Sequence, residues 1–141
     1  MSTLFTKIIQ GELPGRFVWR DDDVVAFLTI NPITPGHTLV VPVAEVDHWL
    51  DLTSAIAGRC MSVAQTVGQA LMTAFSPTRV GLVIAGLEVP HTHLHLIGFD
   101  QESDLAFSKA DPSPDPASLD DAAQRIRAAL EAMGCAEVTD A

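Results

Sequence analysis

The chain has 141 residues, of which 48% are hydrophobic, and its formal net charge is −10. This size and composition predict one globular domain over residues 1–141 with a sizeable core, and the negative charge argues against nucleic-acid binding, which needs clustered Lys and Arg. No apolar run reaches the roughly 18 residues of a membrane span, and no charged-then-apolar leader opens the chain, so we expect a cytoplasmic protein.

The first third of the chain predicts three β-strands. RFVWR (16–20) and VVAFLTI (24–30) flank the acidic triplet DDD (21–23), a pattern typical of a hairpin. A loop marked by Pro and Gly (31–36) follows. HTLVVPV (37–43) is the third predicted strand, and it is apolar on both faces.

From about residue 49 the spacing of apolar residues changes to three or four, which is the signature of an amphipathic helix. Asp51 or Thr53 could cap the start of this long helix, and Pro77 follows its end. The apolar positions that recur along it are Leu52, Ile56, Cys60, Val63, Val67, Leu71 and Ala74.

The second half of the chain predicts two more strands and a C-terminal helix. GLVIAG (81–86) is a short apolar strand, and DPSPDP (111–116) is an irregular surface connection. Ser118 with Asp121 resembles an N-cap and its capping-box partner, which starts a helix over 118–133. Five strands, often adjacent in sequence, and two helices predict an α+β fold built on a mainly antiparallel sheet.

The segment HTHLHLI (91–97) holds three of the chain's five histidines in strict alternation. In a β-strand successive side chains point to opposite faces. His91, His93 and His95 would therefore share one face of the fifth predicted strand. Leu94 and Leu96 would point to the other face, toward an apolar core.

Three imidazoles on one face allow three interpretations. They could bind zinc, although same-face neighbours on a strand lie roughly 7 Å apart, which makes it hard for all three to reach one ion. They could form a hydrogen-bonded surface without chemistry. They could also act in covalent catalysis, with the middle imidazole attacking phosphorus while its neighbours fix its tautomer and stabilise charge.

HTHLHLI matches the His-x-His-x-His-x-x signature of the histidine triad (HIT) family. The segment FTKIIQGELPGRFVWRDDDVVAFLTINPITPGHTLVVP (5–42) also resembles the N-terminal half of that family, so the resemblance covers about residues 3–99. The remainder, 100–141, carries no specific motif. The resemblance implies a homodimer, a five-stranded antiparallel sheet with one long and one C-terminal helix, and no cofactor. It also implies hydrolysis or transfer at the α-phosphate of nucleotides through a nucleotidyl-histidine intermediate.

The resemblance assigns roles to individual residues. His93 would be the nucleophile, His95 would contact the phosphate, and His91 would belong to the hydrogen bonds that orient His93. His37 in PGHTLVVP matches an upstream active-site histidine of the family. His48 matches no role and is expected to be exposed. The substrate-binding positions implied by the resemblance are Phe5, Ile8, Phe27, Thr29, Ile30, Gly86, Glu88 and Val89.

The chain departs from the family at the positions of a structural zinc site. Many bacterial relatives carry Cys-x-x-Cys near the N-terminus and a histidine after the third strand, whereas this chain has Thr3, Thr6 and Glu45. Hydroxyls are poor zinc ligands, and Cys60 and Cys135 lie too far apart for a Cys-x-x-Cys site. We therefore expect no structural zinc.

Two further departures lie in the substrate pocket. Thr29 stands where the family has a ribose-binding Asp, and it lacks the two acceptor oxygens of a carboxylate. Glu88 stands where relatives place Ser or Thr. Its carboxylate would repel a phosphate unless it is protonated or paired, could donate a proton if burial raised its pKa, or could turn outward.

Two functions of different class follow from these residues. The first is a HIT hydrolase or nucleotidyl transferase that acts on a nucleotide phosphoramidate, a dinucleoside polyphosphate or a related phosphoester. The second is a nucleotide-binding or regulatory module with little or no turnover. The complete set of histidines favours the enzyme, and Thr29 and Glu88 keep the binding module open.

Overall fold

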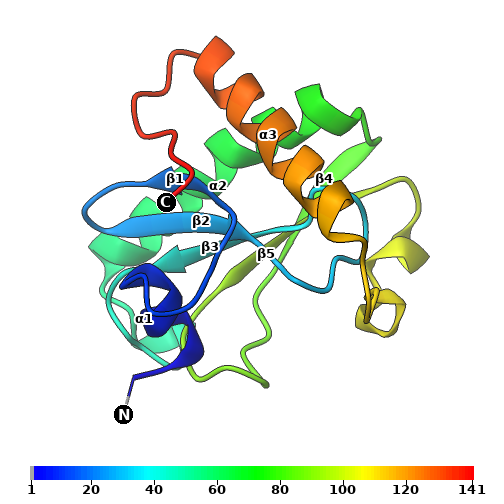
Figure 1. Cartoon of the computed structure of the whole chain (residues 1–141). Helices are drawn as coiled ribbons and strands as arrows, with labels where there is room; N and C mark the ends of the chain where they lie inside the picture. The colour runs from blue at the N-terminus through cyan, green and yellow to red at the C-terminus, as the bar shows by residue number, and fades with distance from the viewer. Residues whose placement is uncertain (1) are drawn as a thin grey trace.

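The computed structural model describes residues 2–141. Its five strands form one sheet in the order β1-β2-β3-β5-β4, and every pair of neighbours is antiparallel (Figure 1). The elements are α1 (Leu4–Ile9), β1 (Phe17–Arg20), β2 (Val24–Leu28), β3 (Thr38–Pro42), α2 (Ser54–Phe75), β4 (Arg79–Val83), β5 (Leu94–Phe99) and α3 (Pro116–Ala132). Short 3₁₀ turns lie at Trp49–Asp51, Glu102–Leu105 and Phe107–Lys109.

The predicted α+β fold and its five antiparallel strands are confirmed, with strand ends that differ by a few residues. The largest difference is in the histidine segment, where β5 begins at Leu94 and not at His91. The backbone before Leu94 forms hydrogen bonds with loop residues and not with a neighbouring strand. The His91 N–H donates to the Val89 carbonyl at 2.8 Å, and the Thr92 N–H donates to the Val46 carbonyl at 2.7 Å.

The helices differ from the sequence-based predictions in two respects. Helix α1 was not predicted, since its six residues are too few to show a helical period. The predicted cap of α3 was wrong. Asp115 is the N-cap and accepts a hydrogen bond from the Ala117 N–H, and Pro116 opens the helix, a position where proline loses no intrahelical bond. Ser118 lies in the first turn and donates to the Asp115 carbonyl at 2.8 Å.

Helix α2 starts as one of the two predicted caps indicated. Thr53 is the N-cap, and its hydroxyl accepts a hydrogen bond from the Ile56 N–H. The helix runs for 22 residues to Phe75, and its buried residues face the sheet. Among the described residues, no helix is both long enough and apolar enough to cross a membrane.

The sheet carries a different core on each face. On one face, α2 and α3 pack on aliphatic side chains that include Leu94 and Leu96 of β5. On the other face, the short helix α1 packs Phe5 and Ile8 against Phe27 and other side chains of β1 to β3. The side chains of β5 that alternate with Leu94 and Leu96 point to this second face, which is where the histidines lie.

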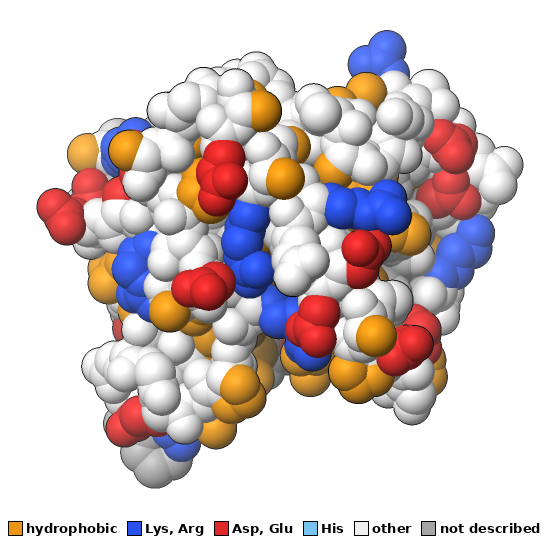
Figure 2. All heavy atoms as spheres, turned by 45° about the horizontal axis from the view of Figure 1, so that its top comes forward, with side chains coloured by type: hydrophobic (Ala, Val, Ile, Leu, Met, Phe, Trp, Pro, Cys, Tyr) orange, Lys and Arg blue, Asp and Glu red, His pale blue; other side chains and the backbone are white. Residues whose placement is uncertain are grey.

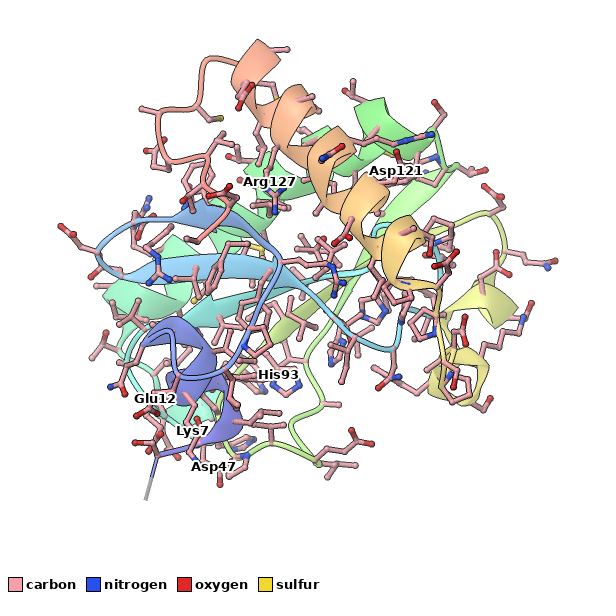
Figure 3. The ribbon with its side chains drawn as sticks, viewed as in Figure 1. Lys7, Glu12, Asp47, His93, Asp121 and Arg127 are labelled. Atoms are coloured by element: carbon pink, nitrogen blue, oxygen red, sulfur yellow. The ribbon has the colours of Figure 1, made fainter. Side chains whose placement is uncertain are left out.

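The exposed surface around α3 mixes both signs of charge. Figure 2 shows Asp and Glu side chains interspersed with Lys and Arg side chains on this face. Arg125 and Asp121 form an ion pair of 2.9 Å along the helix. Arg127, labelled in Figure 3, donates from α3 to the Phe17 carbonyl of β1 at 2.8 Å, which fixes the helix to the sheet.

Candidate active site

His93, labelled in Figure 3, lies beside α1 just before β5, and Phe5 of α1 contacts the rings of both His91 and His93. The rings of His93 and His95 have centroids 4.9 Å apart, and the ring of Phe5 meets His93 edge-on at 4.8 Å. Leu94 and Leu96 are buried in the core under α2 and α3. The alternation predicted for this segment is therefore confirmed, with imidazoles on one side and leucines on the other.

Hydrogen bonding fixes the tautomer of His93. Its Nδ1 lies 2.7 Å from the backbone carbonyl of His91. A carbonyl can only accept, so Nδ1 carries the hydrogen and the lone pair of the neutral ring is on Nε2. This Nε2 makes no hydrogen bond within the described residues. Every buried side-chain nitrogen or oxygen among those residues has a hydrogen-bond partner, so Nε2 is not a buried atom. The lone pair of Nε2 is therefore accessible from outside the fold.

His91 is fully buried and is held from both sides of its ring. Its Nε2 donates to the Pro42 carbonyl at 2.8 Å, so its Nδ1 must accept, and the Thr3 hydroxyl donates to it at 2.8 Å. One oxygen of Glu45 accepts from the Thr3 N–H and from the Thr6 hydroxyl, each at 2.7 Å. These bonds tie the start of α1 to the backbone carbonyl that orients His93.

His37 and His95 form a second, separate chain of hydrogen bonds. The Ile33 N–H donates to His37 Nδ1 at 3.0 Å, so His37 Nε2 carries the hydrogen and donates to His95 Nδ1 at 2.9 Å. The neutral ring of His95 is therefore protonated on Nε2. This N–H has no partner within residues 2–141 and is not buried, so it can donate to a ligand.

Burial keeps these imidazoles neutral at pH 7. Burial, together with the neighbouring His95 and His93 rings, lowers the pKa of His37 to about 3. Burial and the His93 ring lower the pKa of His95 to about 4. Burial also lowers the pKa of His93. Only the neutral form of His93 has a free lone pair, and the lowered pKa favours this form at neutral pH.

A tight turn sets the position of His37 at the start of β3. Gly36 precedes it with a φ of +83°, and a Cβ at this glycine would lie 2.5 Å from the Phe75 ring of α2. Only glycine tolerates both the left-handed backbone and this close approach.

A cavity of about 470 Å³ opens next to His93 and His95. Its wall includes seven predicted substrate-binding residues, namely Phe5, Ile8, Phe27, Thr29, Ile30, Glu88 and Val89. Gly86, the eighth, does not border the cavity, and neither do His37 and His91, which are hydrogen-bonded to His95 and His93 in its wall. His48 lies away from it and is exposed, as expected.

The sequence did not indicate one further wall of the cavity, formed by Leu13, Pro14, Gly15 and Arg16, nor Leu39 of β3, which lies beside His95 in the sheet. At Gly15 an added Cβ would lie 2.7 Å from Ile8 Cγ2, so the glycine lets this turn pack directly on α1. The only sequence signal of this packing is the Pro14-Gly15 pair. Such a pair predicts a turn but does not predict which element the turn packs against.

The two unusual pocket residues both border the cavity. Thr29 is half-buried, and its hydroxyl oxygen already accepts a hydrogen bond from the Asn31 N–H at 3.2 Å. Glu88 is exposed, on the segment between β4 and the triad. Glu88 is therefore not the buried proton donor that the sequence left open. Its carboxylate is exposed at the rim of the cavity.

The residues at the family's zinc positions do not fit a zinc ion. The hydroxyls of Thr3 and Thr6 and one oxygen of Glu45 are engaged in hydrogen bonds with one another and with His91. Across residues 2–141 no group of three or more His, Cys, Asp or Glu side chains is arranged to hold a metal ion.

Comparison with known proteins decides the family. Residues 10–102 match the model of the HIT domain. The chain belongs to the HIT family. An uncharacterized HIT-like protein of Borreliella burgdorferi is 37% identical over 113 residues, which are 75% of this chain and 81% of that protein. The purine nucleoside phosphoramidase of Escherichia coli K12 is 33% identical over 102 residues, 68% of this chain and 86% of the enzyme.

Solved structures agree with the HIT fold. A zinc-bound histidine triad family protein from Mycobacterium smegmatis superposes with a TM-score of 0.82 at 25% identity, over 95% of this chain and 96% of that one. HIT-family membership supports a nucleotide hydrolase or transferase at the level of the family.

Proposed function

We propose that this HIT domain hydrolyses or transfers the nucleotidyl group of a nucleoside phosphoramidate or related phosphoester through a covalent intermediate on His93. The observation that carries the proposal is the hydrogen bond from His93 Nδ1 to the His91 carbonyl. It places the lone pair on Nε2, next to a cavity that can hold a nucleoside.

The reaction proceeds in two steps. His93 Nε2 forms a bond to the α-phosphorus while the bond from phosphorus to the leaving nitrogen or oxygen breaks. The electron pair of that bond stays on the leaving atom, which takes a proton from solvent. Water then adds to phosphorus and loses a proton to solvent, the bond to His93 breaks, and the neutral imidazole is restored. Another acceptor in place of water gives transfer.

The second imidazole at the cavity supplies a hydrogen bond to the phosphate. His95 Nε2–H is unpartnered within the described residues and borders the same cavity as His93. An oriented donor stabilises the charge that develops on the phosphate oxygens in the transition state. His37 holds this donor in place by its own hydrogen bond to His95 Nδ1 at 2.9 Å.

The nucleoside lies in the apolar part of the cavity in this proposal. Phe5 and Phe27 meet edge-on with ring centroids 5.5 Å apart, and Leu39 closes the wall beside them. A base is a flat aromatic ring that stacks on such side chains. The phosphoramidase of Escherichia coli makes purine nucleoside phosphoramidates the first substrates to test.

A binding module with little turnover is the second candidate, and the departure from the family at Thr29 keeps it open. The hydroxyl oxygen of Thr29 already accepts from the Asn31 N–H, so it offers a ribose diol one donated hydrogen bond and one remaining lone pair, where a carboxylate offers two accepting oxygens. Weaker binding of the ribose would lower the turnover rate at a given substrate concentration, although the nucleophile His93 is still present.

Rapid quenching with adenosine 5′-phosphoramidate, followed by mass spectrometry of the intact protein and its peptides, tests the proposal. An enzyme gives ammonia, adenosine monophosphate and a nucleotidyl adduct on His93. Protection against thermal unfolding without turnover or adduct supports the binding module. No turnover, adduct or protection with any member of a purine and pyrimidine panel overturns both.

A homodimer is also part of the proposal. Strand β4 is an edge of the sheet, and a hollow of about 530 Å³ lies between β4 and α2, with the exposed apolar residues Met61, Met72 and Leu82 in its wall. A second copy would cover this edge and its unpaired backbone groups. Light scattering should give twice the chain mass, and Leu82→Lys should give a monomer.

We further propose that the fold needs no structural zinc and that residues 1–141 act as one HIT domain. Metal analysis of the purified protein should find far less than one zinc per chain. Chelation should leave the thermal midpoint unchanged, whereas a fall of several degrees would contradict this. The cytoplasmic location stays a prediction.

A further inference from the structure

The charged side chains around the cavity are few and separated. Of the described residues that line it, only Arg16 and Glu88 carry a formal charge. Arg16 lies in the wall formed by residues 13–16, and its Nε donates to Asp120 of α3 at 2.7 Å, so its charge is already paired. Glu88 precedes Val89 on the rim next to the triad and has no ion-pair partner within residues 2–141.

Among the described residues that line the cavity, the one cation, Arg16, is paired with Asp120, and the neighbouring histidines carry no positive charge to offset Glu88. His37, His93 and His95 are neutral at pH 7 because burial lowers their pKa values. Lys7 and Asp47, labelled in Figure 3, lie near the lower end of α1, and neither lines the cavity. The negative charge of Glu88 also acts on His93, since it works against the burial that lowers the pKa of this ring.

The shape of the cavity determines which part of a substrate meets Glu88. Its interior is apolar, with Phe5, Phe27 and Leu39 in the wall, and accommodates the uncharged nucleoside. With the phosphorus at His93 Nε2, the remaining part of the substrate extends toward the exposed rim. That part is the leaving group, and the exposed carboxylate of Glu88 lies at this rim.

We propose that Glu88 is a specificity residue that selects uncharged or cationic amine leaving groups and rejects anionic ones, so that this protein acts on phosphoramidates and not on dinucleoside polyphosphates. The proposal rests on the covalent reaction at His93 proposed above. A polyphosphate leaving group would bring several negative charges next to an exposed carboxylate, and the one cation among the described lining residues, Arg16, is already paired with Asp120.

An amine leaving group avoids this repulsion. When His93 Nε2 bonds to phosphorus, the P–N bond breaks and its electron pair stays on nitrogen, which takes one proton from solvent to give the free amine. A basic amine then takes a second proton and departs as an ammonium ion. Glu88 attracts this product charge and any cationic group that the amine already carries.

The test uses three adenosine 5′-phosphoramidates of equal length that differ only in the end of the amine: a terminal ammonium, a methyl group or a carboxylate. For the wild type we expect kcat/KM to fall in that order, with about a tenfold difference between the ends of the series at low salt. Added salt should reduce the difference. Glu88→Gln should bring the three values within about twofold, and Glu88→Lys should reverse the order.

Glu131→Gln is the matched control, because Glu131 is exposed on α3 and its loss changes the net charge equally. It should keep the wild-type order. Because Glu88 is exposed, its variants should unfold at the wild-type temperature, and the salt dependence of the wild type tests the proposal without any variant.

The possible failures are distinguishable. Turnover of all three compounds at equal kcat/KM, or faster turnover of a dinucleoside polyphosphate than of the neutral phosphoramidate, overturns the role of Glu88 and leaves the chemistry at His93 intact. Absence of turnover and of adduct with every compound overturns the proposed function itself.

Discussion

The site histidines form two pairs that are held in different ways. In the inner pair, His91 and His93, each ring donates to a backbone carbonyl, at 2.8 Å and 2.7 Å. In the outer pair, His37 and His95, one ring donates to the other at 2.9 Å, and a backbone N–H at Ile33 fixes the direction. The difference explains how chemically identical side chains take opposite roles. His93 is left with a free lone pair, and His95 is left with a free N–H.

Removing the inner ring that carries the lone pair should have the largest effect. His93→Ala should lower kcat by roughly a thousandfold or more, because no other group forms the covalent bond. The unfolding free energy should fall by only about 1–2 kcal/mol, since the ring borders an open cavity that water can enter. Steady-state kinetics and urea unfolding measure the two effects. His48→Ala, an exposed histidine, is the control, and normal turnover by His93→Ala would rule out this nucleophile.

Removing the support of the outer pair should have a smaller effect. His37→Ala leaves His95 free to change tautomer, so its donated hydrogen bond to the phosphate is lost part of the time. We expect kcat to fall by about ten- to a hundredfold with a smaller change in KM. The nucleotidyl adduct should still form on His93, more slowly. An unchanged kcat would show that the bond between His37 and His95 does not serve the reaction.

The outer pair should also make stability depend on pH. Burial depresses the pKa of His37 to about 3 and that of His95 to about 4 in the folded protein, whereas an unfolded histidine titrates near 6.5. The folded state therefore binds fewer protons than the unfolded state between these values. The stabilisation is present above about pH 6.5 and is lost as the pH falls toward 4, by at most about 1.4 kcal/mol per pH unit for each histidine.

Urea unfolding at intervals from pH 7.5 to pH 4.5 measures this dependence. His37→Ala removes one of the two groups and should give a shallower slope than the wild type. Equal slopes in the two proteins would show that the titrating groups lie elsewhere.

The smallest effect is expected where α1 supports the inner pair. Thr3→Val removes the hydroxyl that donates to His91 Nδ1 at 2.8 Å and leaves this buried ring nitrogen with only the Thr6 hydroxyl, at 3.5 Å. The unfolding free energy should fall by about 1–2 kcal/mol, and kcat by a few fold. Thr3→Ser keeps the hydroxyl and should restore both. If Thr3→Val and Thr3→Ser behave alike, the hydroxyl does not hold His91.

The sequence predicted those features that repeat at short range. The alternation of histidines with Leu94 and Leu96 indicated both the strand and its two faces, and the apolar period indicated α2 with its cap at Thr53. Capping was predicted wrongly at α3, because Ser118 fits the common pattern equally well and only the observed backbone shows that Asp115 accepts from Ala117.

The unpredicted parts of the site depend on contacts between distant residues. Arg16 borders the cavity only because Gly15 lets its turn pack on α1, and no periodic pattern carries that information. Likewise, Thr3 and Glu45 could be read as lost metal ligands, but not as partners of each other, since 42 residues separate them. The position of Glu88 at the rim of the cavity also could not be predicted from the sequence, because most of the other cavity-lining residues lie far from it along the chain.

The tautomers of the site histidines test the central claim most directly, and long-range ¹H–¹⁵N correlation spectra of the free protein at pH 7.5 report them. The hydrogen bonds predict that His93 carries its hydrogen on Nδ1, whereas His37, His91 and His95 carry it on Nε2. A spectrum with His93 alone in the Nδ1–H form agrees with a lone pair directed to the substrate. A spectrum with His93 protonated on Nε2 would contradict the proposed nucleophile.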